Sequence, residues 1–289
     1  MSLNTIRWDI DILALSSIVH REDYTTAGTD TLAPFRTEKV LSQDGTPQPP
    51  VPTVSGSSFR GVLRRIGEEL TAEVLDYENA SLPIPAAHLL TNGGRLAKSA
   101  APFTDEDERH LKSLIPQIAV FGGNASGRIM SGLLRVEKVD PEVAELAHLL
   151  RRKPQSATLP SIQTLSEESF THLADHRPNA NHPPRTDADE KTSPLGRFSV
   201  ETLPAGTRLQ TSATIIYATD FQTAFLRDVL TTFATSGHLG GRIAAGHGRI
   251  TATITPDVKR GRLPRKTVDW RAELKTRRDQ ALAALCKIT

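Results

Sequence analysis

Cysteine is almost missing from this chain, which has one, Cys286, among 289 residues. A single thiol forms neither an intramolecular disulfide nor an all-cysteine metal site, so a disulfide-stapled extracellular scaffold is excluded. The sequence also has no apolar run near the roughly 20 residues that a membrane-spanning helix needs. A signal peptide needs an uninterrupted apolar stretch, whereas residues 6–12 alternate apolar and charged side chains. We therefore expect a soluble, cytoplasmic protein without a membrane partner.

A strong charge of either sign and a high aromatic content are lacking too. Lys and Arg number 35 against 33 Asp and Glu, so the net charge is only +2, and aromatic residues make up 5%. The aromatic pairs on which an isolated RNA-recognition motif (RRM) stacks bases are not visible. A nucleic-acid binder of this composition must gather its positive charge on one face and contact phosphates rather than read bases.

Apolar residues recur with two different periods. A period of two predicts strands at residues 6–19, 209–217 and 250–254, and a further strand is expected around residues 128–138. A helical period predicts two amphipathic helices, one after Ser57 and Ser58 as capping residues and one after Thr219 or Asp220. The order strand, helix, strand, strand, helix, strand predicts an α+β fold on the ferredoxin-like βαββαβ plan.

Three long segments fall outside this plan within a single domain spanning residues 1–289. Residues 21–52 form a first loop that is too long for an ordinary connection. Residues 154–195 hold six prolines and few large apolar residues, which indicates an inserted, mobile arm. Residues 263–289 form a C-terminal extension, whose helical stretch at 268–285 is expected to pack Trp270 and Leu274 against the body.

Shorter segments give weaker patterns. Residues 141–152 have the spacing of a short helix, and residues 83–107 could hold a hairpin. The acidic run from Thr104 to Glu108 suits the first turn of a helix, where carboxylates interact favourably with the helix dipole.

The first motif of chemical interest is Gly56-Ser57-Ser58-Phe59-Arg60-Gly61-Val62-Leu63-Arg64. A helix start offers unpaired backbone N–H groups, and two arginines one turn apart share a face, which together suit a phosphate backbone. The spacing and the lysine of a nucleotide-binding P-loop are absent. A capped surface helix with ordinary charges explains these residues equally well.

The second motif is Gly240-Gly241-Arg242-Ile243-Ala244-Ala245-Gly246-His247-Gly248-Arg249. Its glycines allow a ligand to approach the backbone closely, and Arg242, His247 and Arg249 supply positive charge or stacking. It is not a dinucleotide fingerprint, because a strand follows where that motif requires a helix. A glycine-rich connection into an edge strand is the alternative interpretation.

These two motifs resemble the two hallmarks of the RAMP superfamily of CRISPR effector proteins. Phe121-Gly122-Gly123 and Leu203-Pro204-Ala205-Gly206-Thr207 are similar to further stretches of its backbone subunits, in the same order along the chain. The resemblance implies an RRM-like palm with long loop insertions, in which residues 154–195 are the thumb-like arm. The residues that make up the motifs are most similar to those of the backbone subunit of type IV systems.

The resemblance also implies a function and partners. Several copies of such a subunit line up as a helical filament along a CRISPR guide RNA, together with other effector subunits, and present the guide to a complementary target nucleic acid. The residues expected to contact RNA are Arg36, Gly56, Ser57, Ser58, Arg60, Arg64, Gly240, Gly241, Arg242, Gly246, His247, Gly248 and Arg249, with Arg65 on the same face. No cofactor or metal is implied, and the expected role is not enzymatic.

Three alternatives remain open. Gly28-Thr29-Asp30 resembles the loop of type III backbone subunits whose aspartate cuts target RNA, so Asp30 is a candidate catalytic residue, although it could simply cap a turn. A guide-processing ribonuclease is disfavoured, because His20 is the only histidine near the first strand. His172, His176 and His182 with Asp175 could hold a metal, but a solvated proline-rich arm explains them more simply.

Overall fold

The computed structural model of the protein describes residues 3–21, 32–77, 82–96, 102–173, 195–265 and 267–288. Its main sheet has the order β12–β1–β11–β7, and each neighbouring pair is antiparallel. The short strand β8 (Asp140–Pro141) also pairs with β11. The bounds of the four main strands are β1 (Asn4–Ala14), β7 (Leu134–Val136), β11 (Arg208–Ala218) and β12 (Ile250–Arg260).

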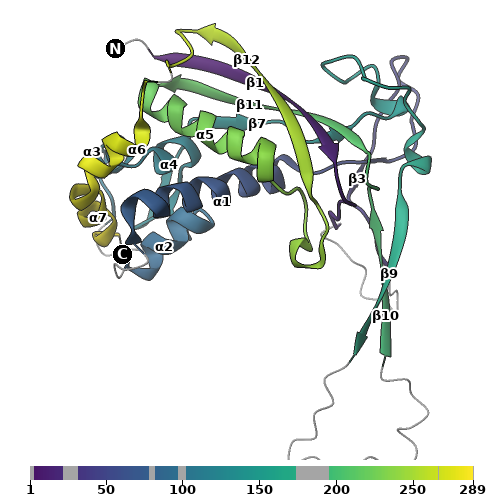
Figure 1. Ribbon diagram of the computed structural model, residues 1–289, viewed down its shortest axis with the longest axis horizontal. Helices are drawn as coiled ribbons and strands as arrows, with labels where there is room; N and C mark the ends of the chain where they lie inside the picture. The colour runs from purple at the N-terminus through teal and green to yellow at the C-terminus, as the bar shows by residue number, and fades with distance from the viewer. Residues whose placement is uncertain are drawn as a thin grey trace, which may run out of the picture.

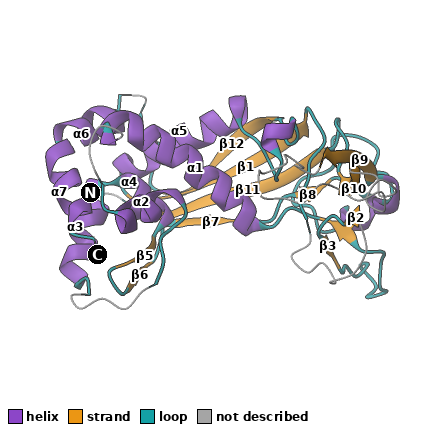
Figure 2. Ribbon diagram, turned by 90° about the horizontal axis from the view of Figure 1, so that it is seen from below, coloured by secondary structure: helices purple, strands orange, loops and turns teal. Residues whose placement is uncertain are grey.

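The two long helices lie side by side beneath one face of this sheet (Figures 1 and 2). They are α1 (Gly56–Leu75) and α5 (Asp220–Ser236). Shorter helices extend this layer at the end of the molecule where the chain terminates: α2 (Ile84–Thr91), α3 (Asp105–Leu114), α4 (Pro116–Phe121), α6 (Trp270–Thr276) and α7 (Arg278–Cys286). Within the described residues, no helix is both long and apolar enough to span a membrane.

Strand β1 shows how the sequence pattern produces this layering. Ile6, Ile10 and Ile12 are at most 2% exposed and face the helices, while Asp9 and Asp11 lie on the opposite face. The opposite face is covered by ion pairs rather than aromatic rings, since Arg152 lies 3.3 Å from Asp9 and 2.8 Å from Asp11. Base stacking on aromatic residues of β1 is therefore excluded on this face of the sheet.

Close contact between the helices depends on a glycine. A Cβ atom at Gly67 of α1 would lie 3.0 Å from the ring of Phe121 and 3.0 Å from that of Phe225. The two helices are capped by local hydrogen bonds, from Ser58 N–H to Ser55 Oγ in α1 and between Thr219 and Gln222 in α5. Ser55 is thus the capping residue of α1, and Ser57 and Ser58 already lie in its first turn.

A hairpin projects from the body at the other end of the molecule (Figure 1). Its strands β9 (Ser166–Leu173) and β10 (Leu195–Thr202) pair over eight residues each, and β2 (Leu32–Ala33) pairs with β10. Strands β9 and β10 are called the arm below; β9 lies within residues 154–195, for which an inserted arm was predicted, and β10 begins at the end of that range. Two small sheets and three 3-10 turns complete the described part of the fold: β3 (Thr37–Glu38) with β4 (Val51–Pro52), β5 (Gly123–Ala125) with β6 (Arg128–Met130), and the turns Ala144–Leu146, Ser161–Gln163 and Ile243–Ala245.

The α+β class predicted from the sequence is confirmed, and β1, α1, β7, β11, α5 and β12 follow one another in the predicted order. The helix expected at residues 141–152 is wrong. Val143 forms a bridge with Leu159, and both carboxylate oxygens of Glu145 accept from Ser161 N–H at 2.9 Å, which favours turns over a helix. The spacing of the apolar residues there serves a small separate core of Val51, Val143 and Leu146.

Two other segments differ from expectation. The strand expected at residues 128–138 is divided into β6 and β7, and the hairpin considered for residues 83–107 is replaced by α2 and the start of α3. Pro85 lies in the first turn of α2, where its missing N–H costs no hydrogen bond. The acidic run does begin a helix, because Thr104 and Asp107 form a capping box at the start of α3.

The C-terminal extension is part of the main core. Trp270 is 1% exposed, its ring stands edge-on to that of Phe225 at 5.0 Å, and its Nε1 donates to Asp228 Oδ2 at 2.8 Å. Leu274, Ala281 and Leu285 are fully buried as well. The expected single helix is divided at Arg277 into α6 and α7.

Replacing Trp270 with Ala should therefore lower the free energy of unfolding by about 4 kcal/mol, since it removes a buried indole and its packing on α5. Trp270→Phe keeps most of the packing and loses only the hydrogen bond to Asp228, so its loss should be smaller than that of Trp270→Ala. Urea unfolding followed by circular dichroism measures both variants. A loss below 1 kcal/mol for Trp270→Ala would mean that the extension does not belong to the core.

Candidate nucleic-acid interface

The segment that follows β1 brings the two sequence motifs together. Here residues 15–21 are called the junction segment. The second motif, residues 240–249, is called the glycine loop. Val19 forms a bridge with Gly241 of this loop, and Gly241 N–H donates to Val19 O at 2.7 Å. The next residue, His20, accepts at its Nε2 from Ser55 N–H, the capping residue of α1, at 3.2 Å. Motifs almost 200 positions apart in the sequence are therefore adjacent in space.

The start of α1 presents hydroxyl groups beside the junction segment. Ser57 is exposed, Ser58 is half-buried, and the hydroxyls of Ser55 and Ser57 lie 3.1 Å apart. Gly56 packs closely on the neighbouring chain, because a Cβ atom there would lie 3.3 Å from the backbone oxygen of Glu137. The first-turn N–H groups and the hydroxyl of Ser57 together can bind an anion.

Arg64 does not belong to this surface. It is 7% exposed, and its guanidinium donates to the backbone oxygens of Gly122 at 3.0 Å, Phe121 at 2.9 Å and Leu89 at 3.3 Å. Burial, and then the charge of Arg60, lower the pKa of Arg64 to about 10, so it stays positive at neutral pH. The expectation that Arg64 lies on an exposed face is wrong, because these carbonyl groups, at the end of α4 and in α2, hold it inside.

Arg60 is directed the same way but is only partly covered. Its Nη2 donates to Phe121 O at 2.6 Å, and burial lowers its pKa. The sequence motifs of α1 and of Phe121-Gly122-Gly123 are thus two halves of one contact. Gly122, with φ of 58°, turns the chain sharply after α4 and leaves its last carbonyls open to the arginines. Arg65, the next arginine in α1, is exposed.

The glycines of the second motif have two different roles. Gly240 and Gly248 have φ of 82° and 80°, and a Cβ atom at either would lie 2.3 Å from a backbone oxygen, of Val19 or of Leu239. Gly246 has φ of 89° but nothing within 4 Å, and Gly241 has ordinary φ with only Val19 O at 3.9 Å. Gly240 and Gly248 are therefore fixed by packing, whereas Gly241 and Gly246 are exposed with room for a ligand.

Arg242 and His247 of this loop face the arm. The guanidinium carbon of Arg242 lies 3.7 Å from the centre of the Phe170 ring, and Phe170 stacks on Phe198 at 5.8 Å. His247 Nδ1 lies 3.0 Å from Ser17 Oγ and 3.9 Å from Glu168 Oε2. The loop and the base of the arm are therefore held together. This contact could not be predicted from the sequence, since Phe170 and Phe198 meet only through the pairing of β9 with β10.

The remaining predicted residues are placed as follows. Arg249 is exposed, and its backbone N–H donates to Ser16 Oγ at 3.0 Å. Arg36 is half-buried beside the junction segment, where its N–H donates to His20 O at 2.7 Å. Asp30, Asp175, His176 and His182 lie outside the described residues, as does the side chain of His172. Within the described part of the chain, no group of three or more possible metal ligands occurs.

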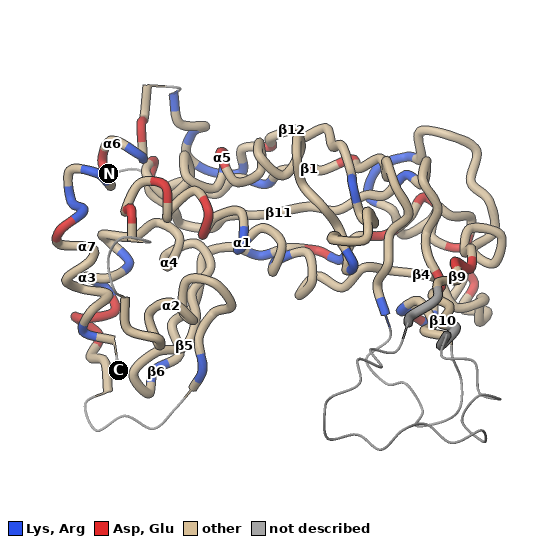
Figure 3. Tube along the Cα trace, turned by 60° about the horizontal axis from the view of Figure 1, so that its bottom comes forward, with Lys and Arg blue, Asp and Glu red and all other residues tan. Residues whose placement is uncertain are grey.

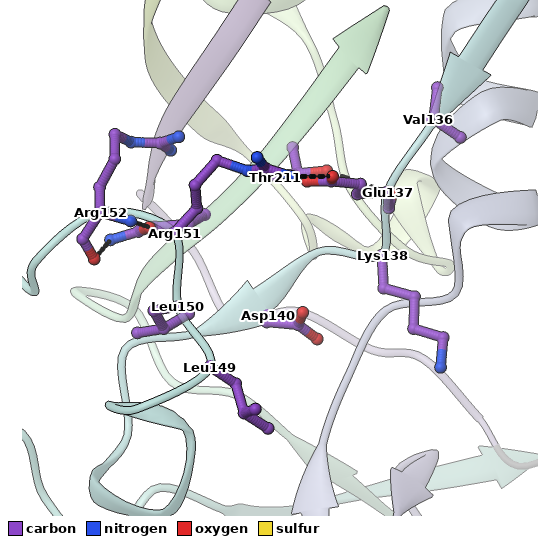
Figure 4. Close-up of a pocket in the computed structure, with 10 residues that line it drawn as sticks. Val136, Glu137, Lys138, Asp140, Leu149, Leu150, Arg151, Arg152 and Thr211 are labelled. Carbon is purple, nitrogen blue, oxygen red and sulfur yellow. Dashed lines mark hydrogen bonds and ion pairs between the residues drawn. The ribbon is translucent and has the colours of Figure 1, made fainter.

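A cleft of about 650 Å³ lies elsewhere, on the face of the sheet opposite the helices (Figure 4). Its lining includes Lys138, Asp140, Arg151 and Arg152, and it contains none of the predicted contact residues. Most of these charges are neutralised locally, since Arg151 pairs with Glu137 at 2.6 Å and Lys138 pairs with Glu38. Burial raises the pKa of Asp140, whose carboxylate accepts from Thr53 Oγ1 at 2.8 Å.

Comparison with known proteins decides the family. The family model of the RAMP superfamily matches residues 37–251, which include both motifs and the arm. The chain belongs to the RAMP superfamily. It is also 53% identical to a chain of a solved structure described as a type IV-B CRISPR complex, with 91% of this chain and 96% of that chain covered and a TM-score of 0.62. The comparison with curated proteins gives no match.

The family predicted from the two motifs is thereby confirmed, and the similarity to a type IV-B complex agrees with the predicted type IV resemblance. The sequence of the α1 start left two interpretations open, a phosphate-binding surface and a capped surface helix. The geometry of this RAMP protein separates the two interpretations: Arg64 supports the fold, and Ser57, Gly241, Gly246 and Arg249 remain exposed.

Replacing Arg64 with Ala should lower the free energy of unfolding by about 3 kcal/mol, because buried carbonyls of Leu89, Phe121 and Gly122 lose their donor. Arg65→Ala is the matched control, and at an exposed position its effect should stay within about 0.5 kcal/mol. Chemical denaturation measures both. Equal stability of the two variants, with RNA binding lost only in Arg64→Ala, would restore Arg64 as a ligand residue.

The contact between Arg242 and Phe170 predicts coupling between the loop and the arm. Arg242→Gln and Phe170→Leu should each speed amide hydrogen exchange in β9 and β10, and the double variant should be no faster than either alone. The coupling should be about 1 kcal/mol, typical of a guanidinium on a partly exposed ring. Arg249→Gln, in the same loop, should leave the arm unchanged, and additive effects of the first two would contradict the contact.

Proposed function

We propose that this RAMP protein is a backbone subunit that binds a CRISPR guide RNA and assembles with further copies of itself into a filament, within a type IV effector ribonucleoprotein. The observation that supports this most directly is the junction segment, which places the α1 start and the glycine loop side by side. Two independent anion-binding features at one place provide a path for a phosphate backbone rather than a site for one phosphate.

The chemistry of this surface suits RNA recognised without regard to sequence. Backbone N–H groups at the start of α1, the hydroxyl of Ser57 and the guanidinium of Arg249 can bind phosphates and 2′-hydroxyls. The exposed glycines Gly241 and Gly246 allow the sugar-phosphate backbone to approach closely. The division of labour is then that the protein reads shape, and base pairing between guide and target reads sequence.

Copies of this chain and other effector subunits are the proposed protein partners, and a complementary nucleic acid is the proposed target. The arm stands beside the glycine loop through Arg242 on Phe170, so a guide on the loop would pass the base of the arm. This location supports a role of the arm in spacing successive copies of the subunit. The resemblance to thumb-containing backbone subunits implies the same role. We place this assembly in the cytoplasm.

We propose no catalytic role for the subunit. The type III alternative depends on Asp30, which lies outside the described residues, so target cleavage through that loop stays a prediction. The relation to a type IV-B complex favours the binding role.

Gly241→Val tests the proposed RNA surface, because the nearest protein atom to a Cβ atom there is Val19 O, at 3.9 Å. We expect at least tenfold weaker binding of guide RNA, measured by filter binding, and little change in the thermal melt. Gly240→Val is the matched control, since its Cβ would meet Val19 O at 2.3 Å and should unfold the loop. If Gly241→Val melts like Gly240→Val, or binds RNA like the parent, the loop is only a structural connection.

A further inference from the structure

The end of the sheet farthest from the arm carries an aromatic residue in an unusual conformation. Tyr217, near the end of β11, has φ of 52° and is 58% exposed. Its N–H donates to Thr5 Oγ1 at 3.3 Å, at the point where the register between β1 and β11 shifts. The left-handed region disfavours a tyrosine, so this exposed ring is held in place against a local conformational preference.

Positive charge gathers beside this ring. Residues 257–265 hold four basic side chains, Lys259, Arg260, Arg262 and Arg265, against one acidic residue, Asp257. The net charge of the whole chain is +2, so this segment of nine residues, at +3, carries more than the total. Blue segments mark this end of β12 and the turn toward α6 in Figure 3.

The contacts show which charges remain available. The guanidinium carbon of Arg260 lies 5.8 Å from the centre of the Tyr217 ring, within the range of a cation–π contact. Lys259 pairs with Asp257, and Arg262 pairs with Asp220 at 3.0 Å although 67% of its side chain is exposed. Arg260 and Arg265 are both exposed. The Tyr217 ring and Arg260, with the exposed Arg265 further along the same basic segment, are called here the Tyr217 patch.

The Tyr217 patch is separate from the glycine loop. Strand β12 begins at Ile250, directly after the loop, and ends at Arg260. At a rise of about 3.3 Å per residue, the ends of this strand are roughly 33 Å apart. Figure 1 shows the same separation, with the end of β12 beside the start of β1 and the arm at the far side. One phosphate group cannot contact both places.

We propose that the Tyr217 patch is a second binding site, for single-stranded nucleic acid, distinct from the guide surface. The exposed face of the Tyr217 ring stacks on a base, and Arg260 and Arg265 neutralise the flanking phosphates. Any base has a flat face, so the site accepts strands of any sequence. An acidic protein segment or an anionic membrane would use the cations, but neither needs an aromatic ring held against its backbone preference.

Tyr217→Gly is a clean variant, because glycine adopts positive φ without strain and removes only the ring. Because the guide surface would bind the same strand, the full-length chain carries Gly241→Val as the background. With a fluorescent 12-nucleotide oligouridylate or oligothymidylate, fluorescence anisotropy should show about tenfold weaker binding when Tyr217→Gly is added to this background. Tyr217→Phe should bind as the parent does. Arg260→Gln should weaken binding and lower the salt slope by about one, while Arg95→Gln, an exposed arginine elsewhere, should change neither.

Photocross-linking separates this site from the guide surface. A 4-thiouridine oligonucleotide should cross-link to the peptide that contains Tyr217, and this product should persist in Gly241→Val and disappear in Tyr217→Gly. Its absence from the parent, or unchanged binding by Tyr217→Gly, overturns the proposal. So does binding of poly-glutamate or phosphatidylserine vesicles that depends on Arg260 but is as strong in Tyr217→Gly, since the patch would then bind anions by charge alone.

Discussion

The hydrogen bonding of one extended stretch, from Asn4 to Arg21, governs how the rest of this protein is arranged. Along β1 both edges are paired, with β11 on one side and β12 on the other. Beyond Ala14 the regular pairing stops, yet Ile18, Val19 and Arg21 still form bridges with Leu203, Gly241 and Phe35. A central strand must satisfy its backbone groups on both sides. Its continuation therefore draws the glycine loop, the first loop and the base of the arm to one place.

The buried charge of Arg64 fixes the position of the α1 start, which lies on the other side of the junction segment. Arg64 keeps its positive charge inside the protein because three backbone carbonyls surround it, at the end of α4 and in α2. Carbonyls at the end of a helix carry partial negative charge, which offsets the loss of water around the guanidinium. The contact sets the position of α1 relative to α4, and with it the position of the first turn that bears Ser57. Arg64, which the sequence suggested as an RNA contact, therefore acts indirectly, by positioning the proposed RNA surface.

The sequence was sufficient for the parts of the fold in which one period dominates. Ile6, Ile10 and Ile12 indicated β1, and the four-residue spacing of Phe221, Phe225, Val229 and Phe233 indicated α5. Prediction from the sequence failed where apolar residues had helical spacing but did not lie on one face of a helix. Residues 141–152 bury Val143 and Leu146 in a small core of their own. Their turns are set by the hydrogen bond from Ser161 N–H to the Glu145 carboxylate, and these two residues are far apart in the sequence.

The candidate site was predictable as a set of residues but not as a set of roles. Glycine content indicated a loop that needs freedom of the backbone, and that holds for Gly240 and Gly248. Which glycines are fixed by packing depends on two carbonyl groups. That of Val19, in the junction segment, leaves no room for a Cβ atom at Gly240, and that of Leu239, just before the loop, leaves none at Gly248. In the same way Arg242 looked like a phosphate ligand, because nothing in its neighbourhood in sequence pointed to Phe170.

The low net charge of the chain has a structural explanation in this arrangement. Acidic groups are paired on the face of the sheet opposite the helices, where Asp9, Asp11 and Glu137 hold Arg7, Arg151 and Arg152 in place. Cations used this way contribute to the count but not to the field outside the protein. Among the cations that remain exposed, Arg249 lies at one end of β12, and Arg260 and Arg265 lie at or just beyond the other. A total of +2 is therefore compatible with two positive surfaces, because attraction of a polyanion depends on where the unpaired charges lie and not on their sum.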